Sequence, residues 1–221
     1  MSGTETSYET DGYALVPQAA PAALAATLLG VIQKDMHASP KVLNSFLSKP
    51  QINAKPAYEF YGYRHPVVMG FHWGMTSRIS ALTGKTLSPT YAFFRVYQKG
   101  DICHVHSDRQ ACEHSFSLAL AYSDEIVWPF EIGADAHSFD EGLKVMASVD
   151  FGEKSSRPVS LNAGDAILYQ GCNYRHGRTT PNPNRWSAHL FLHWVDVDGP
   201  FSAFAFDGHK LPSMRDFQFP A

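Results

Sequence analysis

The sequence lacks the features that mark membrane, secreted and nucleic-acid-binding proteins. No apolar run approaches the roughly eighteen residues that a membrane span requires. The N-terminus, which begins MSGTET, has neither the basic nor the apolar region of a signal peptide. The formal net charge of −3 gives no electrostatic reason to expect nucleic acid or an anionic membrane as a partner. We therefore expect a cytoplasmic protein with no membrane partner and no nucleic-acid partner.

Cysteine is also scarce, with only Cys103, Cys112 and Cys172, an odd number without CxxC spacing. This usage predicts free thiols in a reducing compartment. The chain has 44% hydrophobic and 18% charged residues over a length of 221 residues, which is typical of a globular protein with a substantial core. We expect a single domain over residues 1–221, as a monomer or a homodimer.

Helical patterns precede strand patterns along the chain. Residues 1–11 are polar and are expected to form a flexible tail, and residues 12–17 a short strand closed by proline. Helical spacing predicts one helix over 21–36 and a second over 65–82. Between them, residues 37–66 contain four prolines and an aromatic group without periodicity. Such a long connection is typical of a loop that covers an active site or contacts a substrate.

Beyond Leu87 the pattern changes to short apolar runs separated by Gly, Pro, Asn and Asp. The runs are YAFFRVY, EHSFSLALAY, VWPFEI, LKVMASVDF, PVSL, DAILYQ and RWSAHLFLHWV. Strands at such short intervals predict a β-sandwich or barrel over residues 88–196. Residues 12–87 would pack on its outside and residues 197–221 would form a C-terminal extension. The expected fold class is therefore mostly β with flanking helices.

The last of these runs alternates in character. Its apolar row is Trp186, Ala188, Leu190, Leu192 and Trp194, and its mixed row is Arg185, Ser187, His189, Phe191 and His193. Successive side chains of a strand point to opposite faces. The apolar row can therefore pack on the helices while the mixed row lines an interior. An arginine in that interior would be costly without an anionic partner, which indicates a bound anion.

His106 and Asp108 are two residues apart, so on an extended strand end they point the same way, as two ligands of one metal must. His104 shares that parity and raises the alternative of a cupin, in which His-x-His is followed about four residues later by glutamate. Here the nearest glutamate, Glu113, is seven residues past His106. The HxD interpretation is therefore better than the HxH one. An isolated HxD is weak evidence for a metal site, because such a tripeptide also occurs in surface turns.

The residues further along the chain strengthen the interpretation. His176 follows 68 residues after Asp108, and the loop GRTTPNPN then reverses the chain, so that Arg185 and Ser187 begin the next strand beside His176. Two histidines and a carboxylate can occupy one face of an octahedral iron(II). This pattern of HxD, distal histidine and Arg-x-Ser, over residues 88–196, resembles the 2-oxoglutarate- and iron(II)-dependent dioxygenase superfamily.

The resemblance implies a double-stranded β-helix (jelly-roll) core. It implies that His106, Asp108 and His176 bind Fe(II), and that Arg185 and Ser187 bind the distal carboxylate of the cosubstrate 2-oxoglutarate. Tyr97 precedes the HxD as a tyrosine does in prolyl-hydroxylase-like members and is a further candidate for contact with the cosubstrate. Tyr122 is a weaker candidate, with core packing as its alternative role.

The implied reaction uses O2 to convert 2-oxoglutarate to succinate and CO2 while a substrate C–H is hydroxylated or desaturated. The position six residues after Arg185, where nucleic-acid repair members carry a second arginine, is Phe191. Arg109 and Arg178 are candidates to meet a substrate carboxylate. We therefore expect a small carboxylate-bearing metabolite such as an amino acid as the substrate. The alternatives are a peptidyl (prolyl-type) hydroxylase and a non-catalytic jelly-roll or cupin binding or sensor protein.

Overall fold

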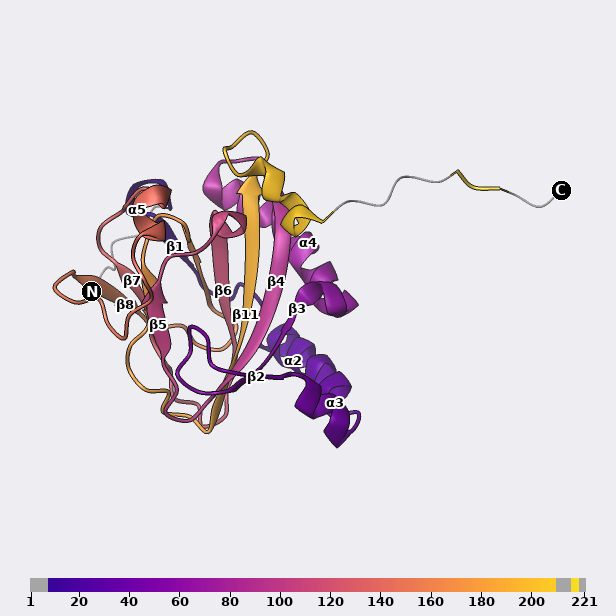
Figure 1. Ribbon diagram of the computed structural model, residues 1–221. Coiled ribbons are helices and arrows are strands. Elements are labelled where there is room, and N and C mark those ends of the chain that lie inside the picture. The colour runs from indigo at the N-terminus through magenta and orange to yellow at the C-terminus, as the bar shows by residue number, and fades with distance from the viewer. Residues whose placement is uncertain (1–7, 210–215, 219–221) are drawn as a thin grey trace.

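Two antiparallel β-sheets, one of seven strands and one of four, lie at the centre of the molecule (Figure 1). They are seen in a computed structural model that describes residues 8–209 and 216–218. Every strand pairing among these residues is antiparallel. Within the same ranges, no helix has both the length and the apolar character needed to cross a bilayer. The expected mostly-β fold with flanking helices is confirmed.

The larger sheet has the strand order β1 (Tyr13–Val16), β9 (Ala166–Tyr169), β6 (His114–Tyr122), β11 (Trp186–Asp196), β4 (Leu87–Gln98), β3 (Ala57–Tyr61) and β2 (Leu47–Ser48). The smaller sheet has the order β5 (Cys103–His106), β10 (His176–Arg178), β7 (Phe130–Gly133) and β8 (Ser156–Val159). The helices are α1 (Tyr8–Asp11), α2 (Ala22–Met36), α3 (Pro40–Ser45), α4 (Pro66–Thr83) and α5 (Phe139–Leu143). Short 3-10 turns are η1 (Gly62–Arg64), η2 (Gln110–Cys112) and η3 (Ser202–Gly208).

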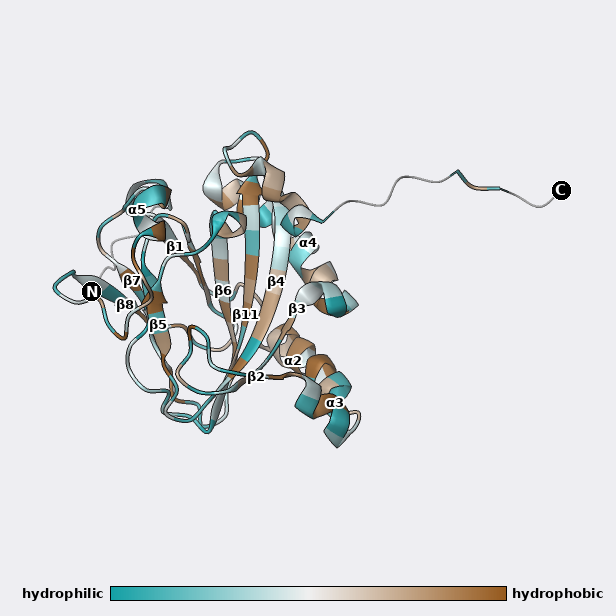
Figure 2. Ribbon diagram, viewed as in Figure 1, coloured by the Kyte–Doolittle hydropathy of each residue, from teal (hydrophilic) through white to brown (hydrophobic). Residues whose placement is uncertain are grey.

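The main hydrophobic core lies between the larger sheet and helices α2 and α4, on the side of the sheet away from the smaller one (Figure 1). Leu190 and Leu192 of β11 belong to it with Ile32 of α2 and Ile79 of α4, and all four are fully buried. Each such side chain stabilises the fold by about 1.5–3 kcal/mol. The alternation expected for β11 is therefore observed, and Figure 2 shows hydrophilic residues interrupting its hydrophobic colour. Its other row faces the smaller sheet.

Three segments differ from the sequence expectation. Residues 8–11, expected in a flexible tail, form α1 because the Tyr8 ring is buried and its hydroxyl is 2.6 Å from His114 Nδ1; residues 1–7 lie outside the described part. Residues 37–66 are more than a loop, since they contain α3 and β3, which extends the larger sheet beside β4. The run 143–151 makes no strand and pairs with the smaller sheet through an isolated bridge between Ser148 and Val105.

Gly177 of β10 provides a test of how closely the smaller sheet is packed. A Cβ added there would lie 2.7 Å from the Cys103 carbonyl oxygen and 3.1 Å from the Val105 backbone. These are backbone atoms that cannot rotate away, so Gly177→Ala is expected to lower the free energy of unfolding by about 1–3 kcal/mol. Gly70→Ala is the control, because its Cβ would meet nothing within 4 Å on α4 and should raise stability by about 0.4–1 kcal/mol. Equal denaturation midpoints for the two variants would contradict this packing.

Candidate metal centre and cosubstrate pocket

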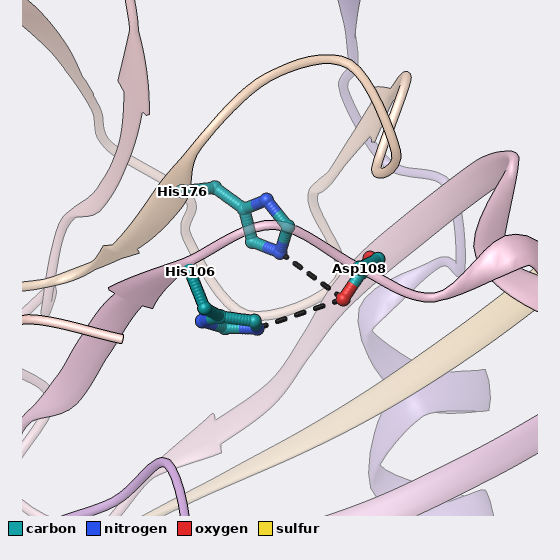
Figure 3. Close-up of side chains that lie close together, drawn as sticks. All are labelled: His106, Asp108 and His176. Carbon is teal, nitrogen blue, oxygen red and sulfur yellow. Dashed lines mark ion pairs between the residues drawn. The ribbon is translucent and has the colours of Figure 1, made fainter. Parts of the chain in front are cut away.

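His106, Asp108 and His176 converge at one end of the smaller sheet (Figure 3). Asp108 Oδ1 lies 3.5 Å from Nε2 of each histidine, and the three ligand atoms all lie within 4.8 Å of one another. Donor atoms at about 2.1 Å from an ion and at right angles to one another are about 3 Å apart. The spacing therefore suits three ligands on one face of a single metal ion.

Both imidazoles are oriented by backbone carbonyl groups. His106 Nδ1 is 2.7 Å from the carbonyl oxygen of His104, and His176 Nδ1 is 2.9 Å from that of Tyr174. A neutral imidazole that donates from Nδ1 keeps a lone pair on Nε2, which is how metal-binding histidines are commonly held. The two Nε2 atoms that face Asp108 are thus the available ligand atoms, and the donor set fits a divalent transition metal.

The charge state of Asp108 also suits a ligand. Burial alone would raise its pKa, but the two neighbouring histidines, His176 and His106, hold the pKa of Asp108 well below its usual range. The carboxylate is therefore ionised. His104 takes no part in this group of ligand atoms; what it contributes is the carbonyl oxygen that orients His106.

A cavity of about 310 Å³ opens beside the three ligands, between the two sheets. His106, Asp108 and His176 line it, and so do Tyr97, Arg109 and Arg178 among the residues singled out from the sequence. The structure thus brings six of the nine candidate residues to one space. Arg185, Ser187 and Tyr122 do not line it.

Arg178 is a buried cation in this cavity, with 1% of its surface exposed. Its guanidinium carbon lies 5.1 Å from the ring centre of Trp128 and 5.3 Å from that of Phe130. Its NH2 group is 3.3 Å from Nδ1 of His189, and its Nε has no hydrogen-bond partner among the described residues. Burial, and then the charge of Arg178, hold the pKa of His189 well below its usual range, so that ring is neutral. No carboxylate in the described part of the chain forms an ion pair with Arg178.

Arg185 lies outside the cavity. It precedes the first residue of β11, its side chain is 71% exposed, and its Nε is 3.2 Å from Asp124 Oδ1. The expectation that its guanidinium points into a water-poor interior is wrong. Strand alternation controls side-chain direction only where the strand is paired, and Asp124 supplies a carboxylate in the adjacent loop.

The other two residues outside the cavity have structural contacts instead. The Ser187 hydroxyl donates to Asn182 Oδ1 at 2.8 Å, which holds the loop that precedes β11. The Tyr122 hydroxyl donates to the Leu161 carbonyl at 2.9 Å, consistent with the core packing given as its alternative role. Neither hydroxyl is directed to the metal ligands.

Tyr97 lies deep in the cavity, whereas Arg109 lies nearer to the solvent. Tyr97 is fully buried, and its hydroxyl accepts a hydrogen bond from Arg95 NH1 at 3.3 Å. Burial raises the pKa of Tyr97, so the hydroxyl keeps its proton.

The Arg109 side chain is 44% exposed, stacks on the Tyr91 ring at 4.5 Å and pairs with Asp207 at 2.7 Å. Asp207 has a left-handed backbone with φ of 58°, a conformation uncommon outside glycine.

Two further cavity residues were missed in the sequence. Arg95 is buried and paired with Glu59 at 2.7 Å, a contact made only because the unpredicted strand β3 lies beside β4. The Tyr169 ring packs against His176 with 4.6 Å between centres, and burial raises the pKa of its hydroxyl well above the usual range. In the sequence, Tyr169 lies in the apolar strand run AILYQ, and nothing in that pattern distinguishes it from a core residue. Two thiols, Cys103 and Cys112, also line the cavity.

No protein-family model and no curated protein matches the chain. Solved structures match it over most of its length. SnoK, a non-heme alpha-ketoglutarate-dependent carbocyclase from nogalamycin biosynthesis, has a TM-score of 0.65 at 12% identity, covering 89% of this chain and 88% of its own. A Pseudomonas putida prolyl-4-hydroxylase has a TM-score of 0.57 at 12% identity, covering 86% and 95%. HygX from Streptomyces hygroscopicus, solved with nickel, 2-oxoglutarate and hygromycin B, has a TM-score of 0.57 at 11% identity, covering 86% and 85%.

At these identities the likeness establishes the fold. The chain has the double-stranded β-helix fold of 2-oxoglutarate- and iron(II)-dependent oxygenases, as the sequence predicted. Its larger and smaller sheets are the two walls of that fold. The roles of individual residues rest on the geometry of this chain.

Removal of any one of the three ligands is expected to abolish metal binding. His106→Ala, Asp108→Ala and His176→Ala each leave two donors, which cannot hold an ion in this geometry. His104→Ala should bind metal like the unmodified protein, because the carbonyl oxygen that orients His106 is retained. Anaerobic titration with Fe(II) or Co(II) measures the four affinities. Loss of binding in His104→Ala with retention in Asp108→Ala would show that the ligand set is wrong.

Proposed function

We propose that the protein is an iron(II)- and 2-oxoglutarate-dependent oxygenase that hydroxylates a small carboxylate-bearing metabolite. One observation carries the proposal. A two-histidine, one-carboxylate group lines the same cavity as a buried arginine that has no carboxylate partner among the described residues. A 2-oxo acid matches this pair, because its keto-acid end can bind a metal while its distal carboxylate binds a guanidinium.

The energetics of Arg178 favour an anionic ligand. A buried guanidinium without an ionic partner costs several kcal/mol, and the neutral His189 together with two aromatic rings offsets only part of that cost. Arg95, the other buried arginine of the cavity, already has Glu59. Arg178 is therefore the cation available for the distal carboxylate of 2-oxoglutarate, the role that the sequence pattern gave to Arg185.

The protonated hydroxyls of Tyr97 and Tyr169 line the same cavity and can donate to carboxylate oxygens. Arg178 shares a strand face with His176, since the two are two residues apart on β10. The cosubstrate would thus extend from the metal ligands towards Arg178. With Fe(II), 2-oxoglutarate and O2 bound, such a centre supplies the oxidation of a substrate C–H, with succinate and CO2 as coproducts.

The substrate would enter where Arg109 lies. This side chain is the half-exposed cation of the cavity, and its partner Asp207 belongs to the short turn η3. A substrate carboxylate can take the place of Asp207 on the guanidinium, which is already held in this position by an ion pair. The fold neighbours are diverse, since they include a carbocyclase, an epimerase and a prolyl-4-hydroxylase. Hydroxylation of a peptidyl side chain is therefore the second candidate.

Release of succinate tests the function against its alternatives. The metal-loaded protein is incubated with 2-oxoglutarate in air, and succinate is measured with and without candidate substrates. An oxygenase gives succinate that depends on added Fe(II). A binding or sensor protein with this fold gives none while it still binds metal, and a cupin-type enzyme gives none and does not bind 2-oxoglutarate.

Arg178→Ala is expected to weaken 2-oxoglutarate binding by about 2–5 kcal/mol, the scale for loss of one partner of a buried charge pair. Metal affinity should change little, because the three ligands remain. Arg178→Lys should recover only part of the loss, since lysine lacks the planar fork of donors. Calorimetric titration of the metal-loaded protein with 2-oxoglutarate measures the effect.

Arg185→Ala is the matched control for that experiment and should leave 2-oxoglutarate affinity within about twofold, because its guanidinium is exposed and paired with Asp124. The opposite result, with affinity lost in Arg185→Ala and kept in Arg178→Ala, would place the anion site outside the cavity.

Arg109→Ala is expected to remove the stimulation of succinate release by carboxylate substrates. Binding of metal and of 2-oxoglutarate should persist, because the three ligands and Arg178 are intact. A panel of amino acids and other small carboxylic acids, each paired with its neutral amide, is assayed by oxygen consumption. Equal stimulation of the unmodified protein by an acid and its amide would contradict recognition of a carboxylate.

A further inference from the structure

The second carboxylate oxygen of Asp108 is held by a separate group of residues. Oδ1 faces the two histidines, as Figure 3 shows, whereas Oδ2 accepts a hydrogen bond from the Ser115 hydroxyl at 3.0 Å. Ser115 lies near the start of β6 in the larger sheet, whereas both histidines belong to the smaller sheet. Its side chain is fully buried.

The proton of the Ser115 hydroxyl has a defined destination. Its oxygen is 2.9 Å from His193 Nδ1, 3.0 Å from Asp108 Oδ2 and 3.1 Å from the Cys112 carbonyl oxygen. A hydroxyl donates one hydrogen bond and can accept two. The ionised carboxylate is the strongest acceptor of the three, so it receives the proton, and His193 then donates from Nδ1 to the serine oxygen.

His193 is itself fixed in place. The Tyr91 ring lies 4.5 Å from its ring centre, and the carbonyl oxygen of His193 is 2.9 Å from Nε2 of buried His72. A hydrogen-bonded chain thus runs from β11 through the serine to the carboxylate. All of its members are at most 5% exposed apart from Asp108 at the cavity wall.

Gly171 closes the remaining side of the carboxylate. Its carbonyl oxygen accepts the Asp108 backbone N–H at 2.9 Å. A Cβ on this residue would collide with Asp108 Oδ2 and lie 2.6 Å from both Ser115 Oγ and the Cys112 carbonyl oxygen. The absence of a side chain at 171 is therefore what allows the serine and the carboxylate to meet.

We propose that Ser115, supported by His193 and Gly171, is a positioning residue that keeps Oδ2 of Asp108 away from the metal, so that the carboxylate binds through Oδ1 alone. The inference rests on the proposed metal centre and adds the control of its coordination number. A carboxylate that binds through both oxygens would occupy one more position. Binding through one oxygen leaves three positions of an octahedral ion for the cosubstrate and O2.

Ser115→Ala tests this role, with Co(II) as the probe because its visible absorption reports coordination number. Loss of a partner that orients a metal ligand typically weakens metal binding by about 10–100-fold. We expect a loss in that range, together with an altered Co(II) spectrum. Thermal unfolding of the metal-free variant is measured alongside to separate this effect from a loss of folding.

Ser117→Ala is the matched control. Ser117 lies two residues along on the same strand, is also fully buried, and its hydroxyl has no hydrogen-bond partner among the described residues. It should bind Co(II) with unchanged affinity and spectrum. His193→Asn, which keeps an N–H near the place of Nδ1, should retain more of the affinity than His193→Leu.

Two outcomes are decisive. If the unmodified protein binds Co(II) and Ser115→Ala matches it in affinity and spectrum, the positioning role is wrong while the metal centre stands. If the unmodified protein binds no metal at these residues, the proposed function itself fails.

Discussion

The antiparallel pairing of β10 with β5 determines the site, because its register sets His176 directly opposite His106. A shift of one residue in either strand would turn one imidazole to the other face of the sheet. Close backbone packing at Gly177 helps to fix that register, and the backbone carbonyls of His104 and Tyr174 then fix the rotation of each ring. The two histidine ligands are therefore positioned mainly by main-chain geometry.

The two faces of the larger sheet have different roles, because one packs in the hydrophobic core and the other lines the cavity. The side towards α2 and α4 is apolar and fully buried, and it can be understood from hydrophobic burial alone. The side towards the smaller sheet carries Arg95, His189 and His193, which are buried polar groups that an ordinary core would exclude. Arg95 has its carboxylate partner within the chain, and His193 its serine. Arg178, on the facing sheet, lacks an ionic partner among the described residues, and this difference points to a ligand.

Much of the architecture was predictable from the sequence, because the helices and most strands have strong periodicity and the residues HxD and His176 are close to strand ends. The position of Arg185 was not predictable, since alternation says nothing about where a strand begins or which carboxylate lies in the next loop. Arg178 had a usable signal, its parity with His176. The strand β3 was hidden among prolines, and the exposed apolar run 143–151 resembled a strand in pattern but pairs with β5 through a single bridge only.

The three ligands are attached to parts of the fold that differ in how well they are packed. His106 and His176 belong to the smaller sheet, which no long helix covers in the described chain, whereas Asp108 is hydrogen-bonded through Ser115 to the larger sheet that carries the main core. An ion bound to all three would connect the two sheets. Its release would lower the cost of local opening in β5 and β10 far more than in β6 or β11. The metal would then stabilise the cavity against local opening of β5 and β10, in addition to any chemistry that it performs there.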